Sequence, residues 1–221
     1  YLRVAPEPGG MSENGPPTVL VVEDEPDVAE TYRRWLQSAY DVRLAADGEA
    51  AMAAVDDAVD VVLLDRMMPE MSGGEVLREI RDRGIDCRVA MVTAVDPDFD
   101  VIEMGFDAYV TKPPDREELF ETIDRLVDRA DLDGDLQEYY SLVARRSALE
   151  TEKTDAELAE SDQYDDLLDR IDDARSAADD DLGDMGSDTE FVGAVREIMD
   201  DETVDGVTGG ESSDGTEGGA E

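Results

Sequence analysis

The sequence contains no histidine, which excludes every function that needs an imidazole in this chain. Histidine kinases and histidine phosphotransfer proteins carry a phosphoryl group on histidine, so the chain is neither. Cysteine occurs once, at Cys87, which excludes an internal disulfide and is typical of a reducing compartment. No apolar run approaches the length that spans a bilayer, and no secretory signal is recognisable. We therefore expect a cytoplasmic protein without a membrane-spanning segment.

Lysine is almost as scarce, since only Lys112 and Lys153 occur and the other bases are arginine. Acids dominate: 60 Asp and Glu face 19 Lys and Arg, for a formal net charge of −41. Self-repulsion on this scale destabilises the compact state unless salt screens it, and the Debye length is about 3 Å in molar salt. We interpret the composition as that of a salt-accumulating halophile, a haloarchaeon. Because the acids then cover the whole surface, they do not by themselves exclude contact with nucleic acid.

Short apolar runs alternate with segments of helical spacing from Thr18 to about residue 130. Runs typical of strands occupy 18–22, 41–45, 60–65, 88–93 and 108–111. Helical spacing occurs within 28–36, 50–55, 76–80 and 119–127. This alternation predicts an α/β fold, a doubly wound (βα)5 unit with a parallel five-stranded sheet. The first, third and fourth runs are the most apolar and should be central strands, whereas the second and fifth should lie nearer the edges.

Polar side chains follow the ends of these strands: Glu23 and Asp24 the first, Asp65 the third, Thr93 the fourth and Lys112 the fifth. Ligands bind at this edge of an open parallel sheet. Converging carboxylates suit Mg²⁺, which prefers oxygen ligands. An ammonium and a hydroxyl suit phosphoryl oxygens, and an aspartate between them can act as a nucleophile that forms an acyl phosphate. Taken singly, Asp65 could cap a turn, Lys112 could be a solvated surface residue and Thr93 a strand end; the joint pattern favours a phosphoryl site.

Four stretches, VLVVEDEP, VVLLDRMMPEMSG, MVTA and YVTKP, resemble the receiver domain of two-component response regulators over residues 18–130. The resemblance implies the flavodoxin-like version of the doubly wound fold, with Asp65 as the phosphoacceptor. It also implies that Mg²⁺ is held by Asp24, Asp65 and the backbone carbonyl of Met67, and by Glu23 through water.

The same resemblance assigns the remaining site residues. Thr93 and Lys112 would hold the phosphoryl oxygens, and Tyr109 would turn inward as a switch when Thr93 moves. The Lys112–Pro113 peptide would be cis. The chain departs from the family pattern at Arg66, where an apolar residue is common, and at Pro114, where an aromatic residue is common.

Beyond residue 130 the strand pattern ends, and residues 131–182 predict an all-α module. One apolar face comprises Leu132, Leu136, Tyr139 and Val143, and a second comprises Tyr164, Leu168, Ile171 and Ala178. Two amphipathic helices in a hairpin or coiled-coil-like pair fit these faces, and a single charged helix in solvent is the alternative. YYSLVARR and YDDLLDRIDDAR resemble the HalX domain that follows receivers in haloarchaeal regulators.

The flanking segments predict little fixed structure. Residues 1–17 form an expected disordered leader that contains Met11, an alternative start to Tyr1. Residues 183–204 form a short helix and linker, with capping-box spacing at Ser187 and Glu190. Residues 205–221 form an expected disordered acidic tail.

These patterns predict a response regulator that a sensor histidine kinase phosphorylates on Asp65. The face made by the fourth helix, fifth strand and fifth helix would change its packing, and the helical module would report the change, to the transcription machinery for example. The alternative is a phosphorelay intermediate or stand-alone receiver that acts only by protein binding. No basic helix-turn-helix is visible, so direct DNA binding is not evident, and a homodimer through either domain is an open option.

We expect no enzymatic activity beyond Mg²⁺-dependent self-phosphorylation. A haloacid-dehalogenase-like phosphatase would also use an aspartyl nucleophile and Mg²⁺. It would need an acid two residues after the nucleophile, where this chain has Met67.

Overall fold

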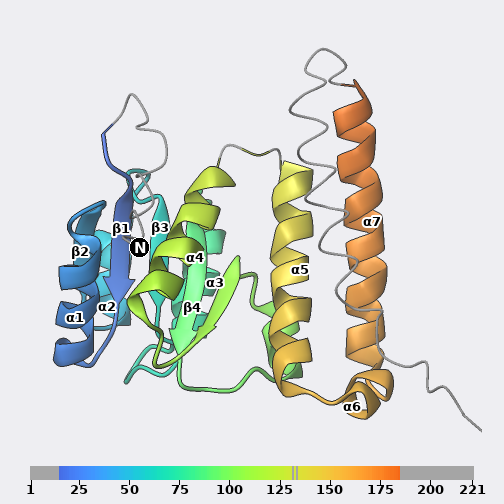
Figure 1. The fold of residues 1–221 in the computed structure, drawn as a ribbon, viewed down its shortest axis with the longest axis horizontal. Helices are drawn as coiled ribbons and strands as arrows, with labels where there is room; N and C mark the ends of the chain where they lie inside the picture. The colour runs from blue at the N-terminus through green and yellow to red at the C-terminus, as the bar shows by residue number, and fades with distance from the viewer. Residues whose placement is uncertain (1–14, 131, 133, 185–221) are drawn as a thin grey trace, which may run out of the picture. The chain divides into compact units, whose positions relative to one another are not determined.

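A computed structural model describes residues 15–130, 132 and 134–184, with side chains of the last helix described as far as Ala178 (Figure 1). Five parallel strands form one sheet in the order β2-β1-β3-β4-β5. They are β1 Thr18–Val22, β2 Asp41–Ala45, β3 Val61–Leu64, β4 Arg88–Thr93 and β5 Ala108–Thr111. The predicted fold class is confirmed. The order reverses between β1 and β3, which is where such sheets bind ligands.

Burial along the strands follows the predicted arrangement. Every residue of β3 and β4 is buried, and β1 is buried after Thr18. β2 and β5 are the edges and are only partly buried. Successive side chains of a buried central strand face opposite layers of helices, so both faces must be apolar.

Helices cover both faces of the sheet. α1 (Pro26–Leu36) and α4 (Arg116–Asp128) pack on one face, where Tyr32, Leu36 and Ile123 join a core with side chains of β1, β3 and β4. α2 (Gly48–Ala54) and α3 (Gly73–Asp82) contact each other and belong to the other layer. A capping box begins α3, because the Ser72 hydroxyl accepts from the amide of Glu75 while the Glu75 carboxylate accepts from the amide of Ser72.

The connection between β4 and β5 differs from a regular repeat. It contains η1, a single 3₁₀ helix at Phe99–Glu103, where the other connections contain α-helices. Val101 and Ile102 are its buried residues, and acids flank them. A segment with so few apolar positions cannot bury a full amphipathic helix face.

The C-terminal module is helical, as predicted: α5 Gly134–Glu152, α6 Asp155–Ala159 and α7 Asp162–Asp184. The predicted apolar faces are largely buried. On α7, Tyr164, Ile171 and Ala178 are buried as predicted, but Leu167 is fully buried and Leu168 only partly. The Tyr164 hydroxyl on α7 donates to Glu150 on α5 at 2.6 Å, which links the two long helices. The predicted leader as far as residue 14, the helix around Ser187 and the acidic tail lie outside the described residues.

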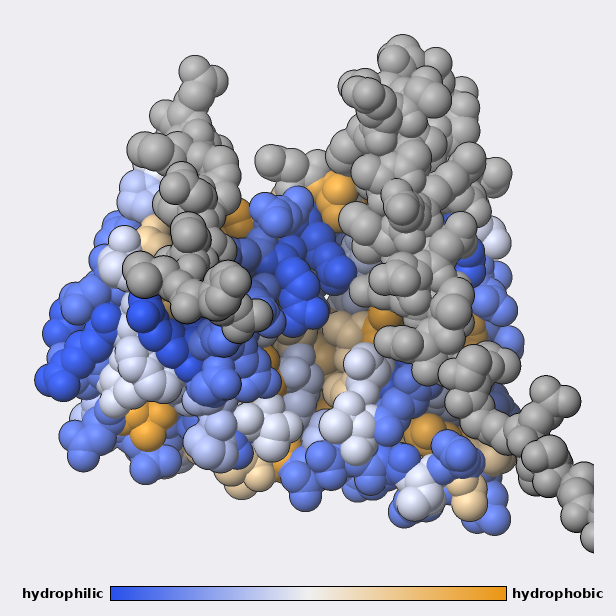
Figure 2. Space-filling model, in the orientation of Figure 1, coloured by the Kyte–Doolittle hydropathy of each residue, from blue (hydrophilic) through white to orange (hydrophobic). Residues whose placement is uncertain are grey.

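The visible surface in Figure 2 is mostly hydrophilic, with only scattered hydrophobic patches. Leu44 and Met67 are the exposed large hydrophobic residues of the described part. Among the described residues, no helix combines the length and hydrophobicity needed to cross a bilayer.

Candidate metal centre

The predicted site residues meet at the carboxyl edge of the sheet. Glu23 and Asp24 follow β1, Asp65 follows β3, and Thr93 is the last residue of β4. Lys112 follows β5 and joins them from the edge strand. Carboxylate oxygens of Glu23, Asp24 and Asp65 all lie within 4.8 Å of one another.

Lys112 is shared by two buried carboxylates. Its Nζ lies 2.6 Å from Glu23 Oε2 and 2.6 Å from Asp65 Oδ2. Glu23 is 2% exposed and Asp65 is 7% exposed. A buried carboxylate without a cation is costly, so a single ammonium holds both in place.

Burial, together with the pairing of Lys112 with two carboxylates, shifts the pKa values of Glu23 and Lys112. Burial raises the pKa of Glu23, even though Lys112 donates a hydrogen bond to it and lowers the pKa. Burial alone would lower the pKa of Lys112, but hydrogen bonds and charges of Asp65 and Glu23 outweigh it and raise the pKa. The Lys112 ammonium therefore does not fully offset the burial of Glu23, which favours a further cation.

The donor set fits a small divalent cation. Three carboxylates supply hard oxygen ligands, and Asp24 is only partly buried and so is open to solvent ligands. Glu23 Oε1 is buried and has no hydrogen-bond partner among the described residues, which is a costly state that a cation or a cation-bound water would relieve. The predicted ligand set, including the Met67 carbonyl, stays a prediction, as does the water-mediated role of Glu23.

The loop after β3 fixes the position of Asp65. Its Oδ1 accepts a hydrogen bond from the amide of Met67 at 3.1 Å. The start of α3 lies directly against this loop: a Cβ on Gly73 would be 2.2 Å from the Asp65 carbonyl oxygen. Glycine is required here because the two backbones approach so closely that a side chain has no space.

Thr93 and Tyr109 both form hydrogen bonds with the backbone of Val95. Thr93 is fully buried, and its Oγ1 accepts a hydrogen bond from the amide of Val95 at 3.3 Å. The Tyr109 hydroxyl donates to the carbonyl of Val95. The two predicted switch residues are therefore linked through the loop after β4. The Lys112–Pro113 peptide is cis, as expected.

Arg66 was noted only as a departure from a pattern, and its partners were not foreseen. It forms an ion pair with Asp100 on η1 and lies beside Tyr109. Burial raises the pKa of Tyr109, and a hydrogen bond with Arg66 lowers it. An unusual arginine beside the predicted acceptor was the available signal, but nothing in the sequence identifies an acid 34 residues away as its partner.

The geometry combines a buried carboxylate, an ammonium 2.6 Å away and an acidic cation site. Such a set can hold a phosphoryl group and its counter-ion next to a nucleophilic oxygen.

Comparison with known proteins agrees with this chemistry. Residues 19–124 match the response regulator receiver domain family, and residues 128–195 match the HalX domain family. The two predicted resemblances are confirmed. The domain boundaries that we predicted stay predictions.

Curated relatives extend the match. A Haloferax volcanii protein named "Putative transcriptional regulator" is 46% identical over 159 residues, which is 72% of this chain and 27% of that protein. The sensory transduction protein RegX3 of Mycobacterium tuberculosis is 41% identical over 111 residues, which is 48% of each chain. The chain thus spans half or less of the length of these relatives.

A solved structure supports the fold alone. The receiver domain protein (CheY-like) from Methanospirillum hungatei is 24% identical, with a TM-score of 0.50, over 53% of this chain and 98% of that one.

Proposed function

Because residues 19–124 belong to the response regulator receiver family and residues 128–195 to the HalX family, we propose that this chain accepts a phosphoryl group on Asp65 in two-component signalling. The observation that carries the proposal is the Asp65 carboxylate, buried and held at 2.6 Å by Lys112 inside an acidic cation site. Neither a structural cap nor a surface ion pair needs three carboxylates within 4.8 Å of one another.

The proposed step is a phosphoryl transfer to one Asp65 carboxylate oxygen. That oxygen attacks the donor phosphorus, an oxygen–phosphorus bond forms, and the bond from phosphorus to the donor's leaving atom breaks with its electron pair remaining on the donor. Bound Mg²⁺ would supply charge neutralisation for the phosphoryl oxygens. Asp24 and Glu23 would hold it, and Lys112 is close enough to Asp65 to pair with a phosphoryl oxygen.

The proposed donor is a phosphohistidine on a sensor kinase, because the chain itself contains no histidine. We place this exchange in the cytoplasm, which suits a buried free thiol at Cys87. The proposed output is a change in the helical module that acts on transcription, since relatives of the receiver carry regulatory names. Action by protein binding alone is the alternative output.

Catalysis is proposed to end with modification of Asp65. Met67 stands two residues beyond the acceptor and has no acid–base chemistry, so nothing at that position promotes turnover on a separate substrate. We therefore propose no enzymatic activity beyond self-phosphorylation.

The test is labelling of the full chain with a radioactive small phosphodonor in molar KCl. We expect Mg²⁺-dependent incorporation that Asp65→Asn abolishes and Asp24→Asn weakens. Asp57→Asn, at an exposed acid away from the site, is the matched control and should label like the wild type. Equal labelling of the Asp65→Asn protein would refute the assignment.

A further inference from the structure

Arg66 lies between the acceptor and η1. Its side chain is only 14% exposed, and it forms an ion pair with Asp100. Its Nη1 is buried and has no hydrogen-bond partner among the described residues. A buried guanidinium nitrogen without an acceptor is costly, so Arg66, beside its contacts with Asp100 and Tyr109, has one nitrogen left for an anion.

Two polar contacts join α5 to η1 and the residues that follow it. Arg145 is 7% exposed and donates to the carbonyl of Ile102 at 2.9 Å. Ser141 Oγ donates to the carbonyl of Phe106 at 2.7 Å and accepts from Arg145 at 2.8 Å. These are main-chain acceptors, so the contact depends on the position of the segment backbone.

Ion pairs connect the helical module to residues at both ends of η1. Lys153, just beyond α5, lies 3.0 Å from an Asp98 oxygen and 5.5 Å from the centre of the Phe99 ring. Arg170 on α7 lies 3.1 Å from Glu103. Polar contacts therefore attach the helical module to residues 98–106 of the receiver, and α5 also packs on β5.

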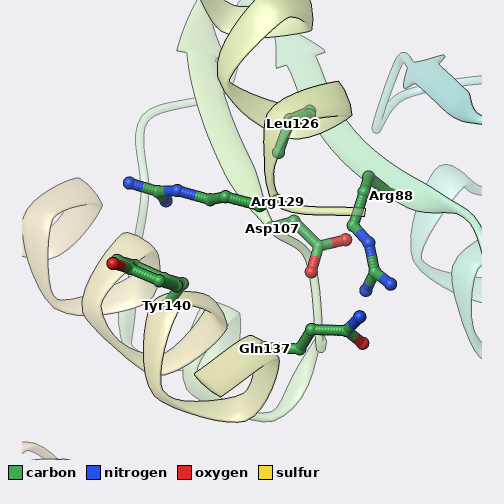
Figure 3. A pocket seen from close by; sticks show the side chains of 6 residues that line it. All are labelled: Arg88, Asp107, Leu126, Arg129, Gln137 and Tyr140. Atoms are coloured by element: carbon green, nitrogen blue, oxygen red, sulfur yellow. The ribbon is translucent and has the colours of Figure 1, made fainter. Parts of the chain in front are cut away.

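The start of α5 has a separate attachment, shown in Figure 3. The Arg129 guanidinium, just after α4, lies 3.8 Å from the centre of the Tyr140 ring. Gln137 donates to the carbonyl of Leu132 at 2.7 Å. The cavity between these side chains and Arg88 is about 10 Å³, about the space of one water. None of these contacts involves a residue of η1, so η1 bears instead on the half of α5 that follows Tyr140.

From this arrangement we propose that Arg66 is the positioning residue that transmits phosphorylation of Asp65 to η1 and thereby to α5. The inference rests on the proposed function. Before transfer, Arg66 holds η1 through Asp100. After transfer, the phosphoryl group on the preceding residue carries about two negative charges in place of the single carboxylate charge, and in this proposal it competes for the guanidinium. η1 then loses its tie to the receiver loop, and the far half of α5 loosens with it.

Competition is realistic because the tie to be broken is weak. The Asp100 side chain is 53% exposed, and water screens such ion pairs. A phosphoryl group presents stronger acceptors to arginine, which binds phosphate in a bidentate geometry. The tie is therefore weak, and it belongs to the residue that directly follows the acceptor in the chain.

The test is hydrogen–deuterium exchange of the full chain in molar KCl, with and without a small phosphodonor and Mg²⁺. In the wild type we expect amides in 99–106 and 141–152 to exchange roughly threefold to fivefold faster after phosphorylation, the range set by one partly exposed ion pair. Arg66→Met, compared with the wild type at equal phosphate occupancy, should show no phosphate-dependent change, because its unphosphorylated state is already loosened. Arg66→Lys keeps the charge and should retain part of the response.

Control variants distinguish a loss of transmission from a general effect of the substitution on the fold. Arg34→Met removes an exposed arginine that pairs with Glu30 on α1, and it should respond like the wild type. Asp100→Asn removes the partner at an exposed position and should match Arg66→Met, so it decides the question if the latter does not fold. The proposal is overturned if phosphorylated wild type shows no change in these amides, or if both variants respond fully. Absence of phosphate on Asp65 in the wild type would instead refute the proposed function.

Discussion

Gly73→Ala is a sharp test of how the acceptor loop is built. The added Cβ would lie 2.2 Å from the Asp65 carbonyl oxygen and 2.9 Å from the Arg66 Cα, and both are backbone atoms. Neither can rotate away as a side chain would, so the start of α3 and the end of β3 must separate by at least about 1.2 Å to reach an ordinary contact. The Ser72–Glu75 capping box fixes one side of that contact and the buried β3 strand fixes the other.

We expect the substitution to destabilise the fold by about 2 kcal/mol, within the range measured for overpacked interiors. For a chain of this size that corresponds to a melting temperature lower by roughly 4–8 °C. Because the displaced backbone carries the acceptor, we also expect phosphorylation to slow by about tenfold to a hundredfold.

Gly74→Ala provides the matched control. There the new Cβ would be 3.2 Å from Met104 Cε, the free end of a flexible side chain. Alanine is also a better helix former than glycine by roughly 0.5–1 kcal/mol, so this protein should melt at or above the wild-type temperature. Melting in molar KCl and labelling by a small phosphodonor measure both effects. If the two variants melt within a degree of each other and label equally, the close approach at Gly73 does not determine the loop.

Mg²⁺ at millimolar concentration should change Trp35 fluorescence or the melting curve in the wild type; Asp24→Asn and Asp65→Asn proteins that respond as strongly would contradict the ligand assignment. Melting temperature should climb steeply from dilute buffer to molar KCl, because a net charge of −41 must be screened, and a flat dependence would remove the halophile interpretation. The acyl phosphate should be long-lived, because apolar Met67 cannot orient an attacking water, and Met67→Asn or Met67→Glu should shorten its life; unchanged rates would refute this. Burial raises the pKa of Cys87 from 9.0 to about 11. At pH 8 its thiolate fraction, and with it the alkylation rate, should therefore be roughly a hundredfold lower than in the unfolded chain, and stability should fall as pH rises above about 9; equal rates in both states would contradict this.

Much of the receiver fold could be predicted, because the information is local. Each central strand is a continuous apolar run that no helix period explains, and the polar residue after it must lie at the carboxyl edge. Asp65 and Lys112 could therefore be placed at one site from the order of the strands alone. The edge strands β2 and β5 were recognisable from their mixed polarity.

The unpredicted features depend on contacts between distant segments. A helical period reveals which face of α5 is apolar, but it cannot show that the charged Arg145 is buried, because that depends on a carbonyl 43 residues earlier. The η1 helix was missed for a related reason, since a repeat of strand and helix suggests an α-helix in every connection. The pairing of Arg66 with Asp100 likewise has no local pattern.

The attachment of the helical module bears on how such chains diversify. Two of its anchor points on the receiver are the carbonyls of Ile102 and Phe106, which any sequence supplies. Sequence-dependent contacts between receiver and module include the acids Asp98 and Glu103, which pair with side chains of the module. After gene duplication, substitution of those two acids would need few mutations. It could prevent the helical module of one copy from pairing with the receiver of another.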